Sequence, residues 1–337
     1  MAMALLATGA VGQAIGAENQ SALHPAGVQA QTIFRLWSGT LWLCTLVFAA
    51  VLAALVWGLL RGSRAARRSA TEAPVAATGP EPRPRRWVFG STVLCGVLLA
   101  GLVATDVLTD HALSRLPASH ALQIEMIGHQ WWWEARYRAT DGKPAFGVSS
   151  DLHVPVGRPV VVTLQSADVI HTFWVPNLHG KKDMLPGRTT TIAFQADRPG
   201  DFRGQCAEFC GAEHALMAFG VRAESPEDFA AWQAAQQGTA AAPATPEAER
   251  GRQLFMQANC AQCHTVRGTP AVGTLGPDLT HLASRPMIAA GTAPNDRTNL
   301  LRWVRNPQVL KPSATMPPAP FGDEDVGAVV SYLEGLK

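Results

Sequence analysis

The chain has 337 residues, of which 47% are hydrophobic and 16% charged, and its formal net charge is +2. This length favours two or three domains, and the apolar excess is concentrated near the N-terminus. Residues 61–86 alone hold seven arginines against two glutamates, so the rest of the chain is slightly acidic. That balance excludes a basic surface for nucleic acid.

Residues 1–35 form an N-terminal segment ahead of the first long apolar run. Its start, Met1 to Ala17, is weakly apolar, and one interpretation is a signal peptide cleaved near residue 17. Signal peptides normally begin with basic residues, and none precedes this stretch. The sequence therefore leaves processing of this segment open.

Residues 36–115 are expected to form a two-helix transmembrane hairpin. The runs 41–60 and 87–105 contain no charged residue, and about 20 apolar residues span a bilayer core. Between them lies the arginine-rich loop, which the positive-inside rule places in the cytoplasm. Both ends of the chain then lie on the opposite side, and a buried hairpin in a soluble core is disfavoured.

Residues 116–234 carry short β-rich segments separated by turn signals, the pattern of an all-β sandwich or barrel. Expected strands are 121–127, 159–165, 189–195 and 216–221. Residues 235–245 form a linker rich in small residues. Residues 246–337 regain a helical period: Thr245 can cap a helix that opens with Pro246, and Asp323 opens the last helix.

Four potential metal ligands fall within twelve residues of the β-rich domain: Cys206, Cys210, His214 and Met217. Thiolate, thioether and imidazole together select copper, zinc or iron–sulfur chemistry. His171 is the natural further ligand, because a sandwich can bring a distant strand end beside such a loop. A disulfide between the two cysteines is the structural alternative.

The block C-x-E-x-C-G-x-x-H-x-x-M, with D-V-I-H upstream, resembles the binuclear copper (CuA) loop of cytochrome c oxidase subunit II. The resemblance implies a cupredoxin fold with two coppers bound by these ligands. It also implies that the backbone carbonyl of Glu208 is a copper ligand and that its side chain reaches a magnesium shared with subunit I. By the same resemblance Trp131 receives electrons from the cytochrome, whereas Trp132 is expected to fill the sandwich.

Cys260-Ala261-Gln262-Cys263-His264 is the attachment pattern of a covalent haem c, with His264 as the proximal iron ligand. Met316, in a Met-Pro loop before the last helix, is the expected second axial ligand, and Met287 is the weaker choice. Gly276 to Leu279 resembles the loop that braces the proximal histidine. Trp303 and Lys311 resemble positions near the haem propionates, with ordinary packing or a surface position as the alternative for either. His281 is expected at the surface or behind a ligand.

Residues 35–337 thus resemble a caa3-type subunit II with a class I cytochrome c domain fused at its C-terminus. The family is an electron-input subunit that passes electrons from haem c through CuA to haem a of subunit I, where oxygen is reduced to water. Implied partners are subunit I with its haem a–copper centre, subunit III, the lipid bilayer and a donor such as cytochrome c or a bc-type complex. The implied location is a bacterial inner membrane, with both cofactor domains outside.

One departure concerns protons, because family members carry a glutamate near the start of the second helix. Here Arg85, Arg86 and Trp87 occupy that neighbourhood, and Glu81 is the nearest acid. The proton route and proton pumping therefore stay open, as do the donor and the redox potentials.

The alternative is the same relay serving a CuA-type nitric oxide reductase, which differs only in its partner. A nitrous oxide reductase would need a histidine-rich catalytic domain, and a copper carrier would have no covalent haem. A quinol oxidase subunit II lacks the copper ligands. In the favoured interpretation, a tether of about ten residues keeps the haem domain at a roughly millimolar effective concentration near its docking face.

Overall fold

The computed structural model describes residues 17–69, 82–113, 120–139 and 144–337. The chain divides into two compact units: the helical unit Thr32–Arg115, and a second unit that holds Met1–Gln31 with Leu116–Lys337. The proposed signal peptide before residue 17, and Glu81, lie outside the described residues.

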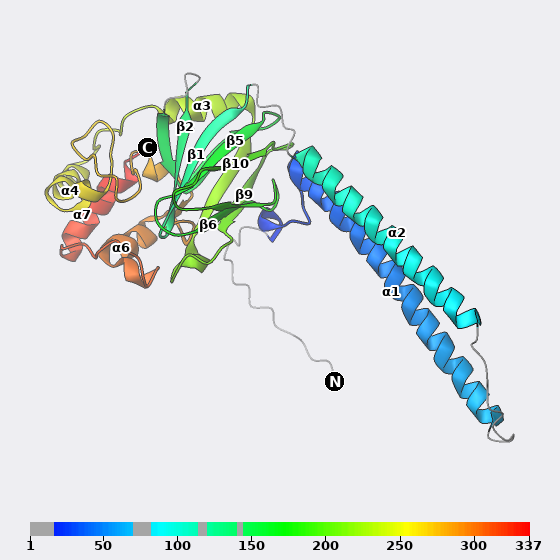
Figure 1. Cartoon of the computed structure of the whole chain (residues 1–337). Helices are drawn as coiled ribbons and strands as arrows, with labels where there is room; N and C mark the ends of the chain where they lie inside the picture. The colour runs from blue at the N-terminus through cyan, green and yellow to red at the C-terminus, as the bar shows by residue number, and fades with distance from the viewer. Residues whose placement is uncertain (1–16, 70–81, 114–119, 140–143) are drawn as a thin grey trace, which may run out of the picture. The chain divides into compact units, whose positions relative to one another are not determined.

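Two long helices make up the first unit, α1 (Val28–Ser69) and α2 (Pro82–Leu113), drawn in blue and cyan in Figure 1. The spans Val28–Ser63 and Arg85–Leu113 are long and apolar enough to cross a membrane, and no part of either apolar window is buried inside the structure. The two predicted apolar helices are confirmed. Helix α1 runs beyond the apolar stretch at both ends, because no proline interrupts residues 28–69.

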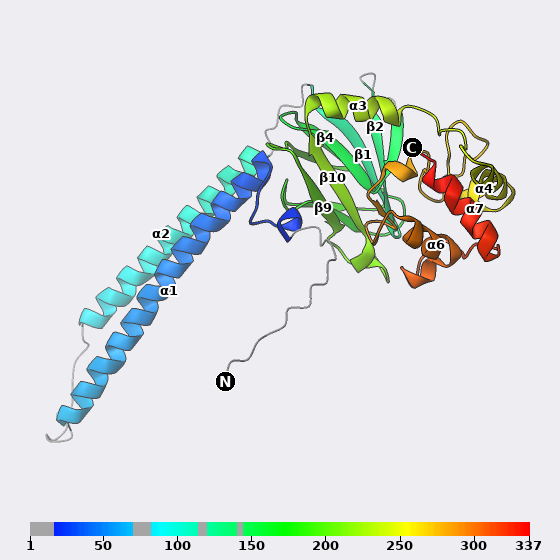
Figure 2. The ribbon, with the colours of Figure 1, turned by 180° about the vertical axis from the view of Figure 1, so that it is seen from behind.

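The β-rich domain is a sandwich of two five-stranded sheets. One sheet has the strand order β3-β2-β1-β5-β8 and the other the order β4-β10-β9-β6-β7. Figures 1 and 2 show it from opposite sides. The strands of the first sheet are β1 (Leu122–His129), β2 (Trp132–Arg138), β3 (Pro144–Ser149), β5 (Val160–Ser166) and β8 (Thr190–Phe194). Those of the second are β4 (Asp151–Pro155), β6 (His171–Trp174), β7 (Lys181–Met184), β9 (Gly200–Cys206) and β10 (Ala218–Glu224).

The core of the sandwich lies between the inward faces of the two sheets. Alternate residues are buried, as in Val160, Val162 and Leu164 of β5, because successive side chains of a strand point to opposite faces. Helix α3 (Pro226–Gln236) follows β10 and is capped by Ser225, whose side chain accepts a hydrogen bond from the Asp228 amide. The four strands expected from the sequence correspond to β1, β5, β8 and β10.

Residues 237–245 connect α3 to the C-terminal domain, so α3 itself extends two residues into the segment expected as linker. The helices of that domain are α4 (Pro246–Gln257), α5 (Cys260–Cys263), α6 (Arg297–Arg305) and α7 (Asp323–Glu334). The Thr245 side chain accepts a hydrogen bond from the Ala248 amide, which is the predicted cap. Short pieces complete the domain: η3 (Leu282–Ser284), β11 (Met287–Ile288), β12 (Ala293–Pro294) and η4 (Pro307–Val309).

Helices α4 and α7 cross at close range. A Cβ atom on Gly251 of α4 would lie 1.9 Å from the carbonyl oxygen of Ala328 in α7. Only glycine allows the two backbones to approach so closely. Around this crossing Phe255, Tyr332 and Leu333 form part of the buried apolar cluster of the domain.

Candidate functional site: a copper-ligand cluster and a haem attachment site

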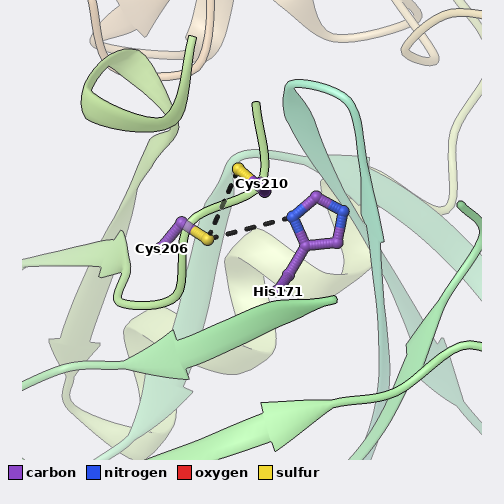
Figure 3. A group of neighbouring side chains, drawn as sticks. All are labelled: His171, Cys206 and Cys210. Carbon is purple, nitrogen blue, oxygen red and sulfur yellow. Dashed lines mark hydrogen bonds between the residues drawn. The ribbon is translucent and has the colours of Figure 1, made fainter. Parts of the chain in front are cut away.

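Strand pairing brings together two predicted ligands that are 35 residues apart in sequence. His171 is the first residue of β6 and Cys206 is the last residue of β9. These strands are antiparallel neighbours, with Phe173 opposite Cys206. The start of β6 therefore lies beside the start of the loop that carries the remaining predicted ligands (Figure 3).

The cluster contains three buried residues whose ligand atoms all lie within 4.8 Å of one another: His171, Cys206 and Cys210. The Cys206 Sγ atom lies 3.8 Å from His171 Nδ1 and 3.8 Å from Cys210 Sγ. On the far side, Cys210 Sγ lies 3.6 Å from His214 Nδ1 and 3.7 Å from Met217 Sδ. The two sulfurs thus form the centre of the cluster, with one histidine beside each.

The two cysteines are free thiols. Their sulfur atoms are far beyond a disulfide length of about 2.05 Å, so the disulfide alternative is not the arrangement in this structure. The hydrogen bond with Cys210 lowers the pKa of Cys206 to about 3, whereas the same bond raises the pKa of Cys210. One thiol of the pair gives up its proton readily, which prepares a thiolate for a soft metal ion.

His171 is oriented by residues that are not ligands. Its Nε2 atom lies 2.8 Å from Asp168 Oδ1, which leaves Nδ1 facing Cys206. Burial opposes protonation of His171, but the hydrogen bonds with Cys206 and Asp168 outweigh it and raise the pKa of His171. Asp168 is itself held by the backbone amide of Gln130 at 2.7 Å. A carboxylate behind a metal-binding histidine is a common device that fixes the ring.

The Glu208 carbonyl oxygen lies 3.2 Å from Cys206 Sγ, so it faces the cluster. The Glu208 side chain is exposed, and its Oε1 accepts a hydrogen bond from the amide of Phe209. Phe209, 74% exposed, is packed edge-on against the His214 ring at a centroid distance of 5.9 Å. The loop therefore presents a carboxylate and an aromatic ring on its outer side.

The three consecutive tryptophans have separate environments. The Trp131 Nε1 atom donates to the carbonyl of Cys210 at 2.9 Å. This hydrogen bond connects the Trp131 side chain to residues 206–217, called here the copper-ligand loop because they carry the predicted ligands. Trp133, not Trp132, fills the sandwich: it is fully buried and its ring lies 6.1 Å from that of His171. Trp132 is half-buried and stacks on His129. The sequence-based expectation for Trp132 was wrong, because β2 starts at Trp132 and alternation points Trp133 inward.

The residues predicted to attach haem lie on the single turn α5 and just after it. His264 Nδ1 lies 2.8 Å from the carbonyl oxygen of Pro277, so Nε2 is left for an iron atom. A Cβ atom on Gly276 would lie 2.6 Å from His264 Cε1, so this loop packs directly on the ring. Burial lowers the pKa of His264, which favours the neutral imidazole that iron needs. The residues present fit a covalent haem c.

Met316 is half-buried in the loop between η4 and α7, and its role as axial ligand stays a prediction. Trp303 packs against the apolar cluster of the domain. His281 is not at the surface: it is 5% exposed, and its Nε2 atom has no hydrogen-bond partner among the described residues.

The haem-propionate position suggested for Lys311 stays a prediction, and the structure shows a further set of contacts for its side chain. Its Nζ atom donates to the carbonyls of Trp131 and Leu216 in the cupredoxin domain. Sequence reasoning also gave no role to Asp168, Gln130 or Glu213. Only Asp168 had a local signal, its place three residues before His171.

Two protein families match the two parts of the chain that carry the predicted sites. Residues 141–224 match the family described as cytochrome c oxidase subunit II, periplasmic domain, and residues 248–337 match cytochrome c. The chain is 33% identical to cytochrome c oxidase subunit 2 of Alkalihalophilus pseudofirmus over 96% of its own length and 92% of that protein. It is 32% identical to the same subunit of Bacillus sp. PS3 over 73% of each chain.

Among solved structures, the periplasmic domain of subunit II of cytochrome oxidase of Bradyrhizobium japonicum is 34% identical, with a TM-score of 0.32 over 36% of this chain and 97% of that one. The two domain types imply a CuA centre and a haem c. The helices α1 and α2 and the periplasmic-domain match fit a membrane protein with an extracytoplasmic part. The chain belongs to the cytochrome c oxidase subunit II family, in the form that carries a cytochrome c domain at its C-terminal end.

Proposed function

We propose that this chain is the electron-input subunit of a caa3-type cytochrome c oxidase in a bacterial inner membrane, with both cofactor domains on the outer side. The observation that carries the proposal is the ligand cluster around Cys206 and Cys210, in one chain with a haem attachment site. When bound, haem c and CuA supply one-electron transfer from an external donor to haem a of subunit I, where oxygen is reduced to water.

The residues have distinct roles in this proposal. Cys206 and Cys210 would hold the copper pair together with His171, His214, Met217 and the Glu208 carbonyl. Trp131 is the contact between the cytochrome side and the copper loop, supported by its hydrogen bond to the Cys210 carbonyl. Cys260 and Cys263 would attach the haem covalently, and His264 and Met316 would be the side chains that hold its iron.

The proposed partners are subunit I, subunit III and a donor such as cytochrome c or a bc-type complex. The exposed side chain of Glu208 supports a magnesium site completed by subunit I, because a hard cation prefers carboxylate oxygens.

The test is purification of the complex from membranes with metal and haem analysis. We expect two coppers and one haem c on this chain, with haem a and a further copper on a partner. Co-purification with haem b and no haem a would instead favour a nitric oxide reductase.

A pair of variants assigns the copper to its ligands. Cys210→Ser should lose copper and keep haem c, because it removes one bridging sulfur. Cys44→Ser, at an exposed cysteine of α1, is the matched control and should keep both. Full copper content in Cys210→Ser would rule out the proposed centre.

A further inference from the structure

Lys311 is a buried lysine whose side-chain hydrogen bonds both reach into another domain. It is 3% exposed, and its Nζ atom lies 2.8 Å from the Trp131 carbonyl oxygen and 3.0 Å from that of Leu216. Leu216 directly precedes Met217, and the Trp131 side chain is bonded to Cys210. One ammonium group of the cytochrome c domain therefore contacts the copper-ligand loop and its neighbouring tryptophan.

Glu213 supplies a second buried contact beside the first. It is 3% exposed, and its Oε1 accepts a hydrogen bond of 2.7 Å from the backbone amide of Ser313. Burial lowers the pKa of Lys311 to about 8, and the negative charge of Glu213 opposes that change. Buried charges are tolerated only when paired or hydrogen-bonded. These contacts thus favour one orientation, since a shifted one would leave both groups without partners.

A third contact comes from the turn after β11. The carbonyl of Ala290 accepts from the amide of Ala218 at 3.0 Å, and the carbonyl of Gly291 accepts from Arg203 at 3.2 Å. The φ angles of residues 289, 290 and 291 are +52°, +56° and +73°. Alanine rarely adopts this left-handed region, and sparsely populated conformations persist where surrounding contacts enforce them. The turn presents its carbonyls to β9 and β10.

We propose that residues 289–292 and 311–313 form a docking surface for the copper-ligand loop of the same chain, and that Lys311 is the positioning residue of this surface. In this standing complex the cytochrome c domain stays bound to the cupredoxin domain. It does not dissociate and diffuse at the end of its linker between electron transfers. The proposal rests on the proposed function, because it places the haem domain at Trp131.

The chemistry of the surface predicts its response to salt. Surface ion pairs weaken as ionic strength rises, whereas buried groups are screened much less. The named contacts are buried or involve backbone atoms. Electron transfer within the chain should therefore keep its rate between low and high salt.

The experiment compares Lys311→Met with Lys337→Met in the full chain within the purified complex. Methionine keeps much of the length and removes the donor, and Lys337 is an exposed lysine of the same domain. The primary readout is hydrogen–deuterium exchange of peptides that contain Ala218 and Ser313. Exchange there should rise about tenfold or more in Lys311→Met, since two hydrogen bonds to a charged group are lost, and should not change in Lys337→Met.

Flash reduction of the haem gives a second readout. In Lys311→Met, the rate at which the copper centre is reduced should fall by a similar factor, with unchanged copper and haem content and unchanged spectra of both centres. Arg203→Gln, on the opposite side of the contact, should give the same changes with a smaller amplitude. Arg203→Gln serves as the test variant if Lys311→Met does not fold or does not incorporate its cofactors.

Unchanged exchange and an unchanged rate in a variant that holds both cofactors would overturn the docking proposal and leave the proposed function intact. Absence of the copper pair or the haem from the unmodified chain would overturn the proposed function itself. A wild-type internal rate that falls steeply with salt would also contradict the buried docking surface.

Discussion

At the scale of single residues, the proposed copper-ligand cluster depends on neighbours outside the proposed ligand set. Asp168 fixes the far nitrogen of His171, and Gly128 of β1 leaves room for its ring. A Cβ atom on Gly128 would lie 2.8 Å from His171 Cδ2 and 3.0 Å from Cγ. The His171 ring cannot easily move away from an added Cβ atom, because it is hydrogen-bonded to Asp168 and lies next to the Trp133 ring.

Gly128→Ala should therefore displace His171 and weaken copper binding. Loss of a supporting contact behind a metal ligand typically lowers metal affinity roughly ten- to hundredfold. Copper per chain, measured after dialysis against a weak chelator, checks this. Gly147→Ala is the control, because its Cβ would lie at an ordinary 3.7 Å from the Ala135 carbonyl oxygen. Equal copper retention in the two variants would contradict the steric argument.

His179 is a residue whose burial affects acid stability. Burial lowers the pKa of His179 to about 4, below the usual value of about 6.5 in an unfolded chain. Between these values the unfolded chain binds more protons, so the stability of the fold falls as the pH drops from about 6.5 to 4. The loss contributed by this residue is about 3 kcal/mol at pH 4.

His179→Gln should lessen this acid sensitivity, because glutamine takes up no proton. Thermal unfolding of the full chain in detergent at pH 7 and pH 4.5 gives the comparison, with His24→Gln at an exposed histidine as control. The midpoint of the wild type should drop further on acidification than that of His179→Gln. Parallel drops in all three proteins would show that His179 is not a source of acid sensitivity.

At the scale of elements, the cytochrome c domain depends on the crossing of α4 and α7. Thr245 and Pro246 set the start of α4, and its Gly251 then meets the backbone of α7 at Ala328. The crossing fixes the apolar cluster that contains Phe255 and Tyr332.

Gly251→Ala should separate α4 from α7 and destabilise the domain by about 1–3 kcal/mol or more, as overpacking does. Gly327→Ala in α7 is the matched control: its Cβ would meet nothing within 4 Å. This second variant should stabilise the helix by about 0.5–1 kcal/mol. Denaturant unfolding followed by the haem absorbance measures the free energy of unfolding of both variants. A Gly251→Ala variant as stable as the wild type would mean that the two helices move apart at no cost.

At the scale of the whole molecule, the proposed complex between the cytochrome c and cupredoxin domains predicts how the chain responds to a longer linker. Loop-closure entropy rises slowly, by about 0.6 kcal/mol for each doubling of length. Ten Gly/Ser residues inserted after Ala242, which is exposed, should therefore slow internal electron transfer by about threefold at most.

Flash reduction of the haem in the lengthened chain measures this effect. The matched control is Lys311→Met with the native linker, in which the slowing should be larger. A collapse of the rate on lengthening, with Lys311 intact, would show that the tether and not the docking surface holds the haem domain.

The sequence by itself determined the local chemistry of this protein. The spacing of Cys206, Cys210, His214 and Met217, and the block from Cys260 to His264, are properties of a short stretch of chain. The helix cap at Thr245 and the lengths of the apolar helices are equally local, because backbone hydrogen bonding and side-chain period act over a few residues. The predicted cap at Thr245 and the two apolar helices are confirmed by the structure.

Only the tertiary structure decided which distant groups meet. The pairing of β6 with β9 brings His171 to Cys206, and the strand register turns Trp133 inward in place of Trp132. Lys311 and Glu213 are charged residues far apart in the sequence, yet both are buried where two domains meet. The physical reason is that burial and hydrogen-bond partners depend on contacts far apart along the chain, which no local pattern of residue types encodes.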